Sequence, residues 1–395
     1  MQRALAIAST LKHDLKIVNP SECDDSNALL SALDSIGFSI TRLANAILIS
    51  PPSKEKALYK LNFNESGLGI RMMAPVLALR AQTFILNGEG SLLNRPMDFI
   101  EKGLQQLQVN ISTQRNKLPI RLVGPMKNGN IEIDGSISSQ FLTGLLLALP
   151  LLNNTSYVKV DALKSIPYID MTIDIMEKFG VYVENDNYEV FTINGNQNYA
   201  LKEYTIEGDW SSASFHLVGA AISGELLIKG IHKHSKQADL RIVEALRRAG
   251  VHVEFLNNSV LVKKKELYAF EFDATHCPDL FPALAILAVA CQGQSKIKGV
   301  HRLLHKESNR SQSILKVLTK LGANIQLEQI NDVFLIHGGT LQGGTIDSHN
   351  DHRIAMMAAI ASLIATQPIE IENPTCVNKS YPNFYKDFLQ ATKTE

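Results

Sequence analysis

One local pattern repeats six times along the sequence, at intervals of about 70 residues. In each copy a short polar or glycine-containing segment leads directly into apolar residues with helical spacing. Successive copies lie 68, 68, 73, 67 and 74 residues apart. This period exceeds that of most solenoid repeats, so each copy has room for several strands and helices. The copies are marked by Arg3, Arg71, Ser139, Ser212, Asp279 and Arg353.

Strand-like runs and a second helix lie between most of these helix starts. Runs such as TFILNG, YVKVDAL, ELLIKGI and SKIKGV are typical of strands. Three segments, beginning at Ile169, Ala238 and Ser311, have the order helix, glycine, strand, and the glycine fits the position just after a helix. This alternation predicts an α/β or α+β architecture of six similar units, three in each of two domains. The length of 395 residues also fits two domains.

The bulk composition excludes several classes of protein. Hydrophobic residues make up 45% and charged residues 20%, as in an ordinary globular chain. Lys+Arg and Asp+Glu balance at 39 each, so no net basic charge favours nucleic acid. No apolar run reaches membrane-spanning length, and no signal-peptide pattern is visible. Four scattered cysteines, without CxxC or metal-ligand spacing, predict reduced thiols in a cytoplasmic protein: Cys23, Cys277, Cys291 and Cys376.

Arginines lie unusually early in four of the expected helices. The amino end of a helix carries partial positive charge, so a cation there is mildly unfavourable. For one helix, a solvated arginine is the simpler interpretation; four such helices favour sites for bound anions. We therefore predict a small ligand with several negative charges. The four are Arg3, Arg71, Arg310 and Arg353, and Arg95 in the loop-like GEGSLLNRPM is a further cation.

Two of these helices have clear candidate caps. Asn350 or Asp351 is expected to cap a helix that begins near residue 352, whose apolar face continues to Ile364. Ser308 is expected to cap the helix that contains Arg310.

Nine segments, in order across almost the whole chain, carry a more specific pattern. They are SGLGIRM, GEGSLLNRPM, GSISSQFLTGLLLALP, SIPYIDMT, EGDWSSASF, PDLFPALA, HKESNR, NDHRIAMM and NKSYPNFYKDF. Together they resemble the enolpyruvyl transferase family, in the branch that acts on shikimate 3-phosphate. The resemblance implies a two-lobed inverse α/β barrel of six βαβαββ repeats, three per lobe, closing over its substrates. We expect an N-terminal lobe at 1–207, on the shikimate 3-phosphate side, and a C-terminal lobe at 208–395, on the phosphoenolpyruvate side.

The same resemblance implies the reaction. The enolpyruvyl group of phosphoenolpyruvate would move to the 5-hydroxyl of shikimate 3-phosphate, releasing phosphate through a tetrahedral intermediate. Two phosphates and two carboxylates require several cations, preferably arginines with their planar fork, and the proton transfers require an acid and a base. No metal and no organic cofactor is implied, nor any nucleic-acid or membrane partner, and the family expectation is a cytoplasmic monomer.

Site residues carry over from the family motifs onto matching positions. Asp279 would orient the sugar-ring hydroxyls and act as base, and Glu307 would carry the second proton transfer. Shikimate 3-phosphate would be held by Arg3, Ser138, Ser139, Gln140, Ser165, Tyr168, Asp279 and Lys306. Phosphoenolpyruvate would be held by Gly67, Arg71, Arg95, Gln140, Arg310, Arg353 and Lys379.

Several of these residues also have a purely structural interpretation. Ser138 with Ser139, and separately Asp279, could be helix N-caps. Glu307 could form a local ion pair with Lys306. Tyr168 could be a packed loop aromatic, and His352, to which we assign no chemistry, a structural histidine.

The chain departs from the family pattern at its start and at four other positions. The family has a Lys-Ser pair just before the arginine that corresponds to Arg3, and Met1 stands there instead. We expect Met1 to be an internal methionine with an upstream segment missing, which would leave one sheet edge of the C-terminal lobe unpaired; a shortened, impaired relative is the alternative. The other departures are Glu65, Leu68, Arg302 and Asn309, the first two near the expected phosphoenolpyruvate site, where they bear on glyphosate sensitivity.

Three other functions compete. The sister UDP-N-acetylglucosamine enolpyruvyl transferase uses a cysteine in a glycine-rich loop, but residues 85 to 97 contain none. A non-catalytic protein that binds shikimate 3-phosphate would follow from loss of the Lys-Ser pair. RNA 3′-phosphate cyclases share a related repeat unit, but the neutral charge counts against an RNA-processing enzyme.

Overall fold

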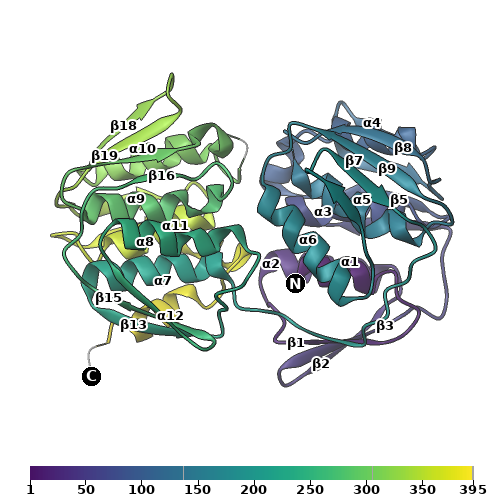
Figure 1. Cartoon of the computed structure of the whole chain (residues 1–395), viewed down its shortest axis with the longest axis horizontal. Coiled ribbons are helices and arrows are strands. Elements are labelled where there is room, and N and C mark those ends of the chain that lie inside the picture. Colours follow the sequence, from purple (N-terminus) through teal and green to yellow (C-terminus); the bar gives the residue numbers. More distant parts are fainter. Residues whose placement is uncertain (137, 305, 394–395) are drawn as a thin grey trace. The chain divides into compact units, whose positions relative to one another are not determined.

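The chain forms two compact units, Met1–Ile206 and Glu207–Glu395, each built from small sheets and helices (Figure 1). The computed structural model describes residues 1–136, 138–304 and 306–393. The helices are α1 Gln2–Ala8, α2 Asp24–Ser35, α3 Gly67–Leu77, α4 Asp98–Gln106, α5 Ser139–Ala148, α6 Ile166–Lys178, α7 Trp210–Ser223, α8 Ile242–Arg248, α9 Phe281–Ala290, α10 Arg310–Lys320, α11 His352–Ala361 and α12 Phe384–Ala391. The strands are β1 Leu15–Val18, β2 Ser39–Leu43, β3 Ala46–Ser50, β4 Leu58–Asn62, β5 Thr83–Asn87, β6 Asn110–Gln114, β7 Lys117–Val123, β8 Asn130–Asp134, β9 Ser156–Asp161, β10 Glu184–Asp186, β11 Val190–Ile193, β12 Glu203–Thr205, β13 Glu225–Lys229, β14 His252–Leu256, β15 Ser259–Lys263, β16 Glu271–Asp273, β17 Gln294–Lys298, β18 Asn324–Glu328, β19 Val333–His337, β20 Gly344–Asp347 and β21 Ile369–Glu372.

Six small sheets confirm the expected sixfold architecture. The first unit has the strand orders β12-β1-β3-β2, β4-β5-β7-β6 and β8-β9-β11-β10, and the second has β13-β15-β14, β16-β17-β19-β18 and β20-β21. Among the described residues, three repeats have the full order βαβαββ in continuous sequence; they begin at β4, β8 and β16. The first repeat instead takes its parallel strand from β12, which pairs with β1 from the far end of the unit.

The predicted order of helix, glycine and strand is confirmed in all three places. Gly180 follows α6, Gly250 follows α8 and Gly322 follows α10, with φ angles of 85°, 90° and 87°. These angles lie in the left-handed region, which glycine enters without a steric penalty. Each glycine therefore ends its helix and turns the chain into the next strand.

Within the described residues, β13 has an open edge. In the other five sheets the equivalent strand carries a parallel neighbour, as β12 beside β1 and β16 beside β17. β13 pairs only with β15, and its Leu227 is 42% exposed. An exposed, partly apolar edge offers unpaired backbone groups to other chains.

Any association of chains through this edge should be weakened by Leu227→Lys. The dissociation constant should rise several-fold, because a lost apolar contact or an opposed charge contributes up to about 1 kcal/mol. Sedimentation velocity over a concentration series measures this. The matched control is Leu389→Lys, which removes a leucine that is 59% exposed on α12 rather than on a sheet edge. An equal effect of both substitutions would assign the association to general apolar surface.

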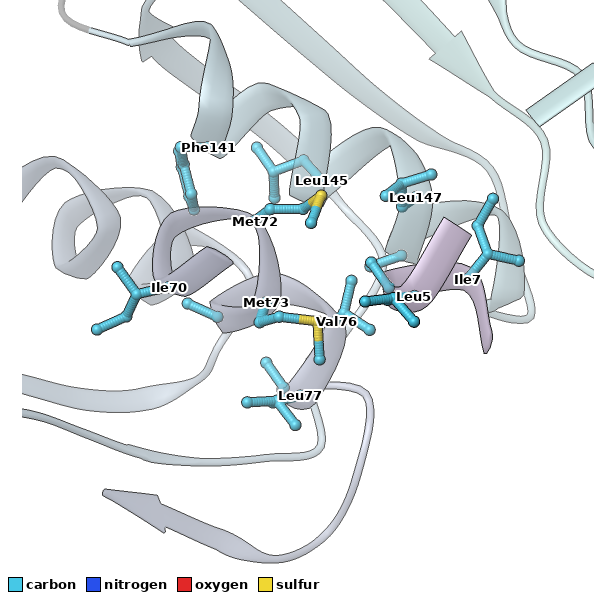
Figure 2. Close-up of a cluster of buried hydrophobic side chains, with 14 of the residues drawn as sticks. Leu5, Ile7, Ile70, Met72, Met73, Val76, Leu77, Phe141, Leu145 and Leu147 are labelled. Atoms are coloured by element: carbon cyan, nitrogen blue, oxygen red, sulfur yellow. The ribbon is translucent and has the colours of Figure 1, made fainter. Parts of the chain in front are cut away.

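In the first unit, the close packing of α3 and α5 places two helix starts together. Met72 and Val76 of α3 and Leu145 of α5 belong to one buried cluster (Figure 2). A Cβ atom on Gly144 would lie only 2.4 Å from the carbonyl oxygen of Met72, so this position requires glycine. This contact fixes the segments that carry Gly67 and Gln140.

In the second unit, α7, α9 and α11 contact one another around an apolar interior, with α9 buried on nearly every side.

Cys23, Cys277 and Cys291 are buried and Cys376 is half-buried; all four are free thiols, as predicted. In the part of the chain that the structure describes, no helix combines the length and apolar character needed to cross a bilayer.

Candidate active site

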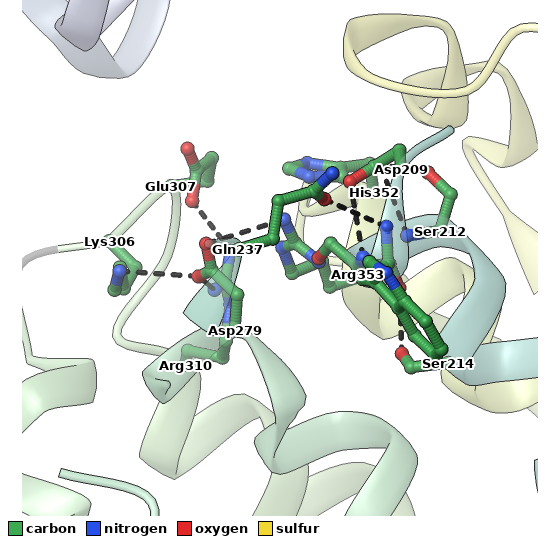
Figure 3. Close-up of polar contacts among 12 residues, drawn as sticks. Asp209, Ser212, Ser214, Gln237, Asp279, Lys306, Glu307, Arg310, His352 and Arg353 are labelled. Carbon is green, nitrogen blue, oxygen red and sulfur yellow. Dashed lines mark hydrogen bonds and ion pairs between the residues drawn. The ribbon is translucent and has the colours of Figure 1, made fainter. Parts of the chain in front are cut away.

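The amino ends of four segments in the second unit meet in a charged cluster (Figure 3). The segments are α7, α10, α11 and the 3-10 turn η4, Pro278–Leu280, that leads into α9. Side chains from each contact one another through the hydrogen bonds described below. Since four partly positive helix ends converge here, acidic side chains are stabilised among them and anions are attracted.

Arg310 is the centre of this cluster. Its side chain is fully buried, yet it makes four hydrogen bonds to three carboxylates. Nε and Nη2 donate to the two oxygens of Asp351 at 2.9 and 3.1 Å, a bidentate pair. Nη1 donates to Asp279 at 2.8 Å, and Nη2 also donates to Glu307 at 2.6 Å. The guanidinium therefore fixes the positions of both predicted proton-transfer residues.

Asp279 is held by three cations. Besides Arg310, Lys306 Nζ donates to its Oδ1 at 3.2 Å and Arg353 Nη2 to its Oδ2 at 3.3 Å. Burial raises the pKa of Asp279, but the charges of Arg353, Lys306 and Arg310 lower it by more, to well below the usual range. The alternative that Asp279 is a helix N-cap is wrong, because it lies inside η4 and Leu280 precedes α9.

Two local expectations for residues 306–310 need correction. Ser308 does not cap α10: its hydroxyl donates to Asp351 Oδ2 at 3.0 Å, and Asn309 accepts from the Gln312 N–H instead. Glu307 binds Arg310 one helical turn later, while Lys306 binds Asp279. In both cases a buried side chain binds the polar group in place of the local partner. Asp351 accepts from Ser308, and Arg310 donates to Glu307.

Asp351 and Arg353 begin α11 and extend the cluster to α7. Asp351 caps the helix by accepting from the Arg353 N–H at 3.0 Å, as the sequence predicts, and α11 ends at Ala361, short of Ile364. Arg353 Nη1 donates to the hydroxyl of Ser211 in the first turn of α7. The Gln237 side chain accepts from the Trp210 N–H at 2.8 Å, which orders the start of that helix.

Two other buried titratable groups lie at this cluster. Burial raises the pKa of Asp239 to about 7, and the charge of Asp279 adds to the rise. Burial and the neighbouring Arg353 lower the pKa of His352 to about 3, so the imidazole is neutral. The neutral state agrees with a structural role for His352.

In the first unit, Arg71 and Gln140 join the amino ends of α3 and α5. Arg71 Nη1 donates to Gln140 Oε1 at 3.1 Å, and its guanidinium lies 5.4 Å from the ring centre of Phe99. Arg95 Nη1 lies so close to Gly67 that a Cβ there would be 2.8 Å away. Two arginines and an amide therefore surround the start of α3.

Arg3 connects α1 to α6. Its Nε donates to Thr172 Oγ1 at 2.9 Å and its Nη2 to the carbonyl oxygen of Tyr168 at 3.0 Å. Burial lowers the pKa of Arg3 to about 10, so it remains charged at neutral pH.

The remaining predicted residues lie at the ends of helices. Ser138 caps α5 by accepting from the Gln140 N–H at 3.1 Å, which confirms the N-cap interpretation, and Ser139 is the first residue of that helix. Ser165 precedes α6 in a left-handed conformation, with φ of 59°. Lys379 is the last residue of the 3-10 helix η6, Pro374–Lys379, which packs against α11.

Sequence reasoning missed partners that lie far away in the chain. Asp351 carried only the signal of an N-cap, and its bidentate pairing with Arg310 spans 41 residues. Nothing in the sequence identified Thr172 as the partner of Arg3 or Asp239 as a buried acid.

Comparisons with known proteins identify the family. A profile of the EPSP synthase family, described as 3-phosphoshikimate 1-carboxyvinyltransferase, matches residues 1–388. The 3-phosphoshikimate 1-carboxyvinyltransferase of Clostridium kluyveri is 37% identical, with 98% of this chain and 91% of that protein covered. The Clostridium botulinum (strain Alaska E43 / Type E3) protein of the same name is 36% identical, with 94% and 88% covered.

A solved structure shows the same fold. EPSP synthase from Acinetobacter baumannii superposes with a TM-score of 0.82 and 24% identity, over 99% of this chain and 92% of that one. With a profile match over nearly its whole length and relatives above one-third identity, this chain belongs to the EPSP synthase family.

Proposed function

We propose that this protein transfers the enolpyruvyl group of phosphoenolpyruvate to the 5-hydroxyl of shikimate 3-phosphate. Membership of the EPSP synthase family over residues 1–388 carries the proposal. The two clusters support it, because they supply buried cations for anionic substrates and two carboxylates for proton transfer.

The proposed binding roles divide by substrate. Arg3, Ser138, Ser139, Ser165, Tyr168 and Lys306 hold shikimate 3-phosphate, and Gln140 contacts both substrates. Gly67, Arg71, Arg95, Arg310, Arg353 and Lys379 hold phosphoenolpyruvate. Arginine suits these positions because its fork matches phosphate and carboxylate with two parallel hydrogen bonds. We also propose that the first unit, through Arg3, serves mainly shikimate 3-phosphate.

The reaction requires two balanced proton movements. A carboxylic acid adds a proton to the methylene carbon of phosphoenolpyruvate while the 5-hydroxyl oxygen attacks C2 and loses its proton to a base. The resulting tetrahedral intermediate then expels phosphate and loses a methyl proton, which restores the double bond. We assign the base to Asp279 and the second proton transfer to Glu307, which Arg310 holds in a defined position.

The environment of Asp279 suggests how binding prepares the base. Arg353, Lys306 and Arg310 hold its pKa well below the usual range, so without substrate it is a weak base. Anionic substrates that engage Arg353 and Lys306 would offset their positive charge. The pKa of Asp279 would then rise, which makes the carboxylate a stronger base.

A steady-state assay of phosphate release tests the function. Release should require both phosphoenolpyruvate and shikimate 3-phosphate, and NMR should identify an enolpyruvyl ether on the 5-oxygen. UDP-N-acetylglucosamine in place of shikimate 3-phosphate should give no release. Binding of shikimate 3-phosphate without turnover would instead support the non-catalytic alternative, and turnover with the nucleotide sugar would support the sister activity.

Gly67→Ala should weaken phosphoenolpyruvate binding without unfolding the chain. The new Cβ would meet the flexible end of Arg95 at 2.8 Å and Gln140 Oε1 at 3.9 Å, so the chain should still fold, with a loss of stability of at most about 1 kcal/mol. The displaced guanidinium should lose a charge-assisted contact, which raises the Michaelis constant for phosphoenolpyruvate about tenfold. The control is Gly129→Ala, whose Cβ would have an ordinary 3.8 Å contact with Leu107. An unchanged Michaelis constant would remove Arg95 from the proposed site.

Family membership is also our basis for proposing a cytoplasmic monomer. Sedimentation equilibrium measures the mass of the protein in solution and so tests for a monomer. An oligomer that dissociates in the Leu227→Lys variant would be assigned to the open edge of β13, and one that persists to a different interface.

A further inference from the structure

Three hydrogen-bonded side chains in the second unit, one buried and two half-buried, lie outside the proposed site. His216 Nε2 lies 3.2 Å from the hydroxyl of Tyr381, and that hydroxyl donates to Asp387 Oδ2 at 2.7 Å. His216 is on α7 and only 8% exposed, whereas Asp387 is on α12. These hydrogen bonds therefore join α7 to α12 through Tyr381, which lies 165 residues after His216 in the sequence.

The direction of these hydrogen bonds follows from the number of protons. A tyrosine hydroxyl has one proton, and the carboxylate of Asp387 can only accept. Because the hydroxyl donates to Asp387, the contact to His216 requires the imidazole to donate from Nε2. We assign the Nε2–H tautomer to His216 on this basis. Each donor then polarises the next, which strengthens consecutive hydrogen bonds of this kind.

Aromatic packing restricts the same residues. The rings of Tyr381 and His216 meet edge to face, with their centres 5.7 Å apart. The centre of the Phe384 ring lies 5.5 Å from that of His216 and 5.7 Å from that of Tyr381. Phe384 is fully buried at the start of α12. Tyr381 is thus held by its ring as well as by its hydroxyl.

Tyr381 lies two residues after Lys379, in a tightly bonded turn. The N–H of Tyr381 donates to the carbonyl of Val377 at 2.8 Å, and the Phe384 N–H donates to the carbonyl of Tyr381 at 3.1 Å. Lys379 lies between the two residues joined by the first of these hydrogen bonds, so its backbone belongs to the same turn. His216, at the other end of the hydrogen-bonded series, is part of α7. Ser211, in the first turn of α7, accepts a hydrogen bond from Arg353.

We propose that Tyr381, held by His216 and Asp387, is a positioning residue for Lys379 in phosphoenolpyruvate binding. It fixes the turn that carries Lys379 to the helix whose first turn contacts Arg353, so the two cations keep a defined separation. A point-charge contact from lysine depends on such placement, since small displacements of a binding group cost much of its effect. The proposal rests on the proposed function, because it takes Lys379 to be a ligand of phosphoenolpyruvate.

Tyr381→Phe tests this directly. The substitution keeps the ring and removes the hydroxyl, and the Michaelis constant for phosphoenolpyruvate should rise about three- to tenfold. The Michaelis constant for shikimate 3-phosphate and kcat should change less than twofold. Asp387→Ala should reproduce the effect, whereas Asp387→Asn, which keeps an oxygen acceptor for the hydroxyl, should restore most of the affinity.

Tyr385→Phe is the matched control. Tyr385 is on α12, four residues after Tyr381, and its buried hydroxyl has no hydrogen-bond partner among the described residues. This variant should have wild-type constants for both substrates. A rise for phosphoenolpyruvate as large as that of Tyr381→Phe would overturn the proposal, as would a Tyr381→Phe variant that loses thermal stability with unchanged substrate constants. Activity of the wild-type enzyme with both substrates is the separate test of the proposed function.

Discussion

Arg310→Met is expected to lower the free energy of unfolding by about 3–5 kcal/mol, the usual cost of removing one partner from a buried ion pair. The wild-type guanidinium is fully buried and donates to Asp279, Glu307 and Asp351. Methionine fills similar volume but cannot donate, so three carboxylates would lose their shared cation. Urea unfolding at neutral pH measures the loss, and turnover should disappear with it.

An exposed ion pair provides the control. Lys296 donates to Glu271 at 2.8 Å on the surface of the second unit. Lys296→Met should change stability by less than about 1 kcal/mol, because solvent screens such a pair. Comparable losses from both substitutions would mean that the Arg310 cluster contributes no more than a surface contact.

The pH dependence gives a second test of the same variant. Burial raises the pKa values of Asp279 and Asp351, but neighbouring cations lower both by more. In the wild type their contribution to stability is therefore present above the ordinary carboxylate pKa and is lost as the pH falls through the lowered values. Without Arg310 the buried carboxylates should protonate more readily. The stability difference between wild type and Arg310→Met should thus narrow from pH 7 to pH 5, and a constant difference would contradict the network.

Asp279→Asn and Glu307→Gln are each expected to lower kcat by about 10²–10⁴, the usual effect of losing a positioned proton-transfer group. Both substitutions keep the size of the side chain and one acceptor oxygen, but the amide NH2 cannot accept from the neighbouring cations, so some loss of stability is expected beside the loss of turnover. Shikimate 3-phosphate binding should survive Glu307→Gln better than Lys306→Ala, because the lysine is assigned to the substrate and the glutamate to the chemistry. Stopped-flow phosphate release and calorimetric binding measure the two effects.

Glu244→Gln is the control for the general effect of removing one negative charge from the second unit. Glu244 pairs with Arg241 and Arg248 at 3.1 and 2.6 Å on α8, outside the cluster. Its substitution should leave kcat within about twofold, because surface changes have small effects. Near-normal turnover in both cluster variants would leave Asp279 and Glu307 with a structural role as partners of Arg310.

Local sequence predicted the repeat architecture well. The helix, glycine and strand order around Gly180, Gly250 and Gly322 depends on neighbouring residues alone, and the structure confirms all three. The pairing of β12 with β1 could not be predicted in the same way. Lys16 of β1 pairs with Glu203 of β12, which lies 187 residues later in the sequence. Backbone pairing between such distant strands does not depend on a recognisable local residue pattern.

The site was only partly predictable. Repeated arginines at helix starts indicated anion sites, and family motifs supplied the candidate residues. The pairing of Arg310 with Asp351 was not predictable, because each residue had a local interpretation and their contact forms only when α10 and α11 pack together. The prediction that Ser308 caps α10 was wrong for the same reason, because the Ser308 hydroxyl donates to Asp351 instead.

Deuterium incorporation during turnover in D₂O tests the central claim most directly. If enolpyruvyl transfer proceeds through protonation of the methylene carbon, the vinyl methylene of the product should gain deuterium, and only when shikimate 3-phosphate is present. Glu307→Gln should lower the rate of incorporation together with phosphate release. Phosphate release with no deuterium in the product would contradict a methyl-bearing intermediate and, with it, the proposed roles of Asp279 and Glu307.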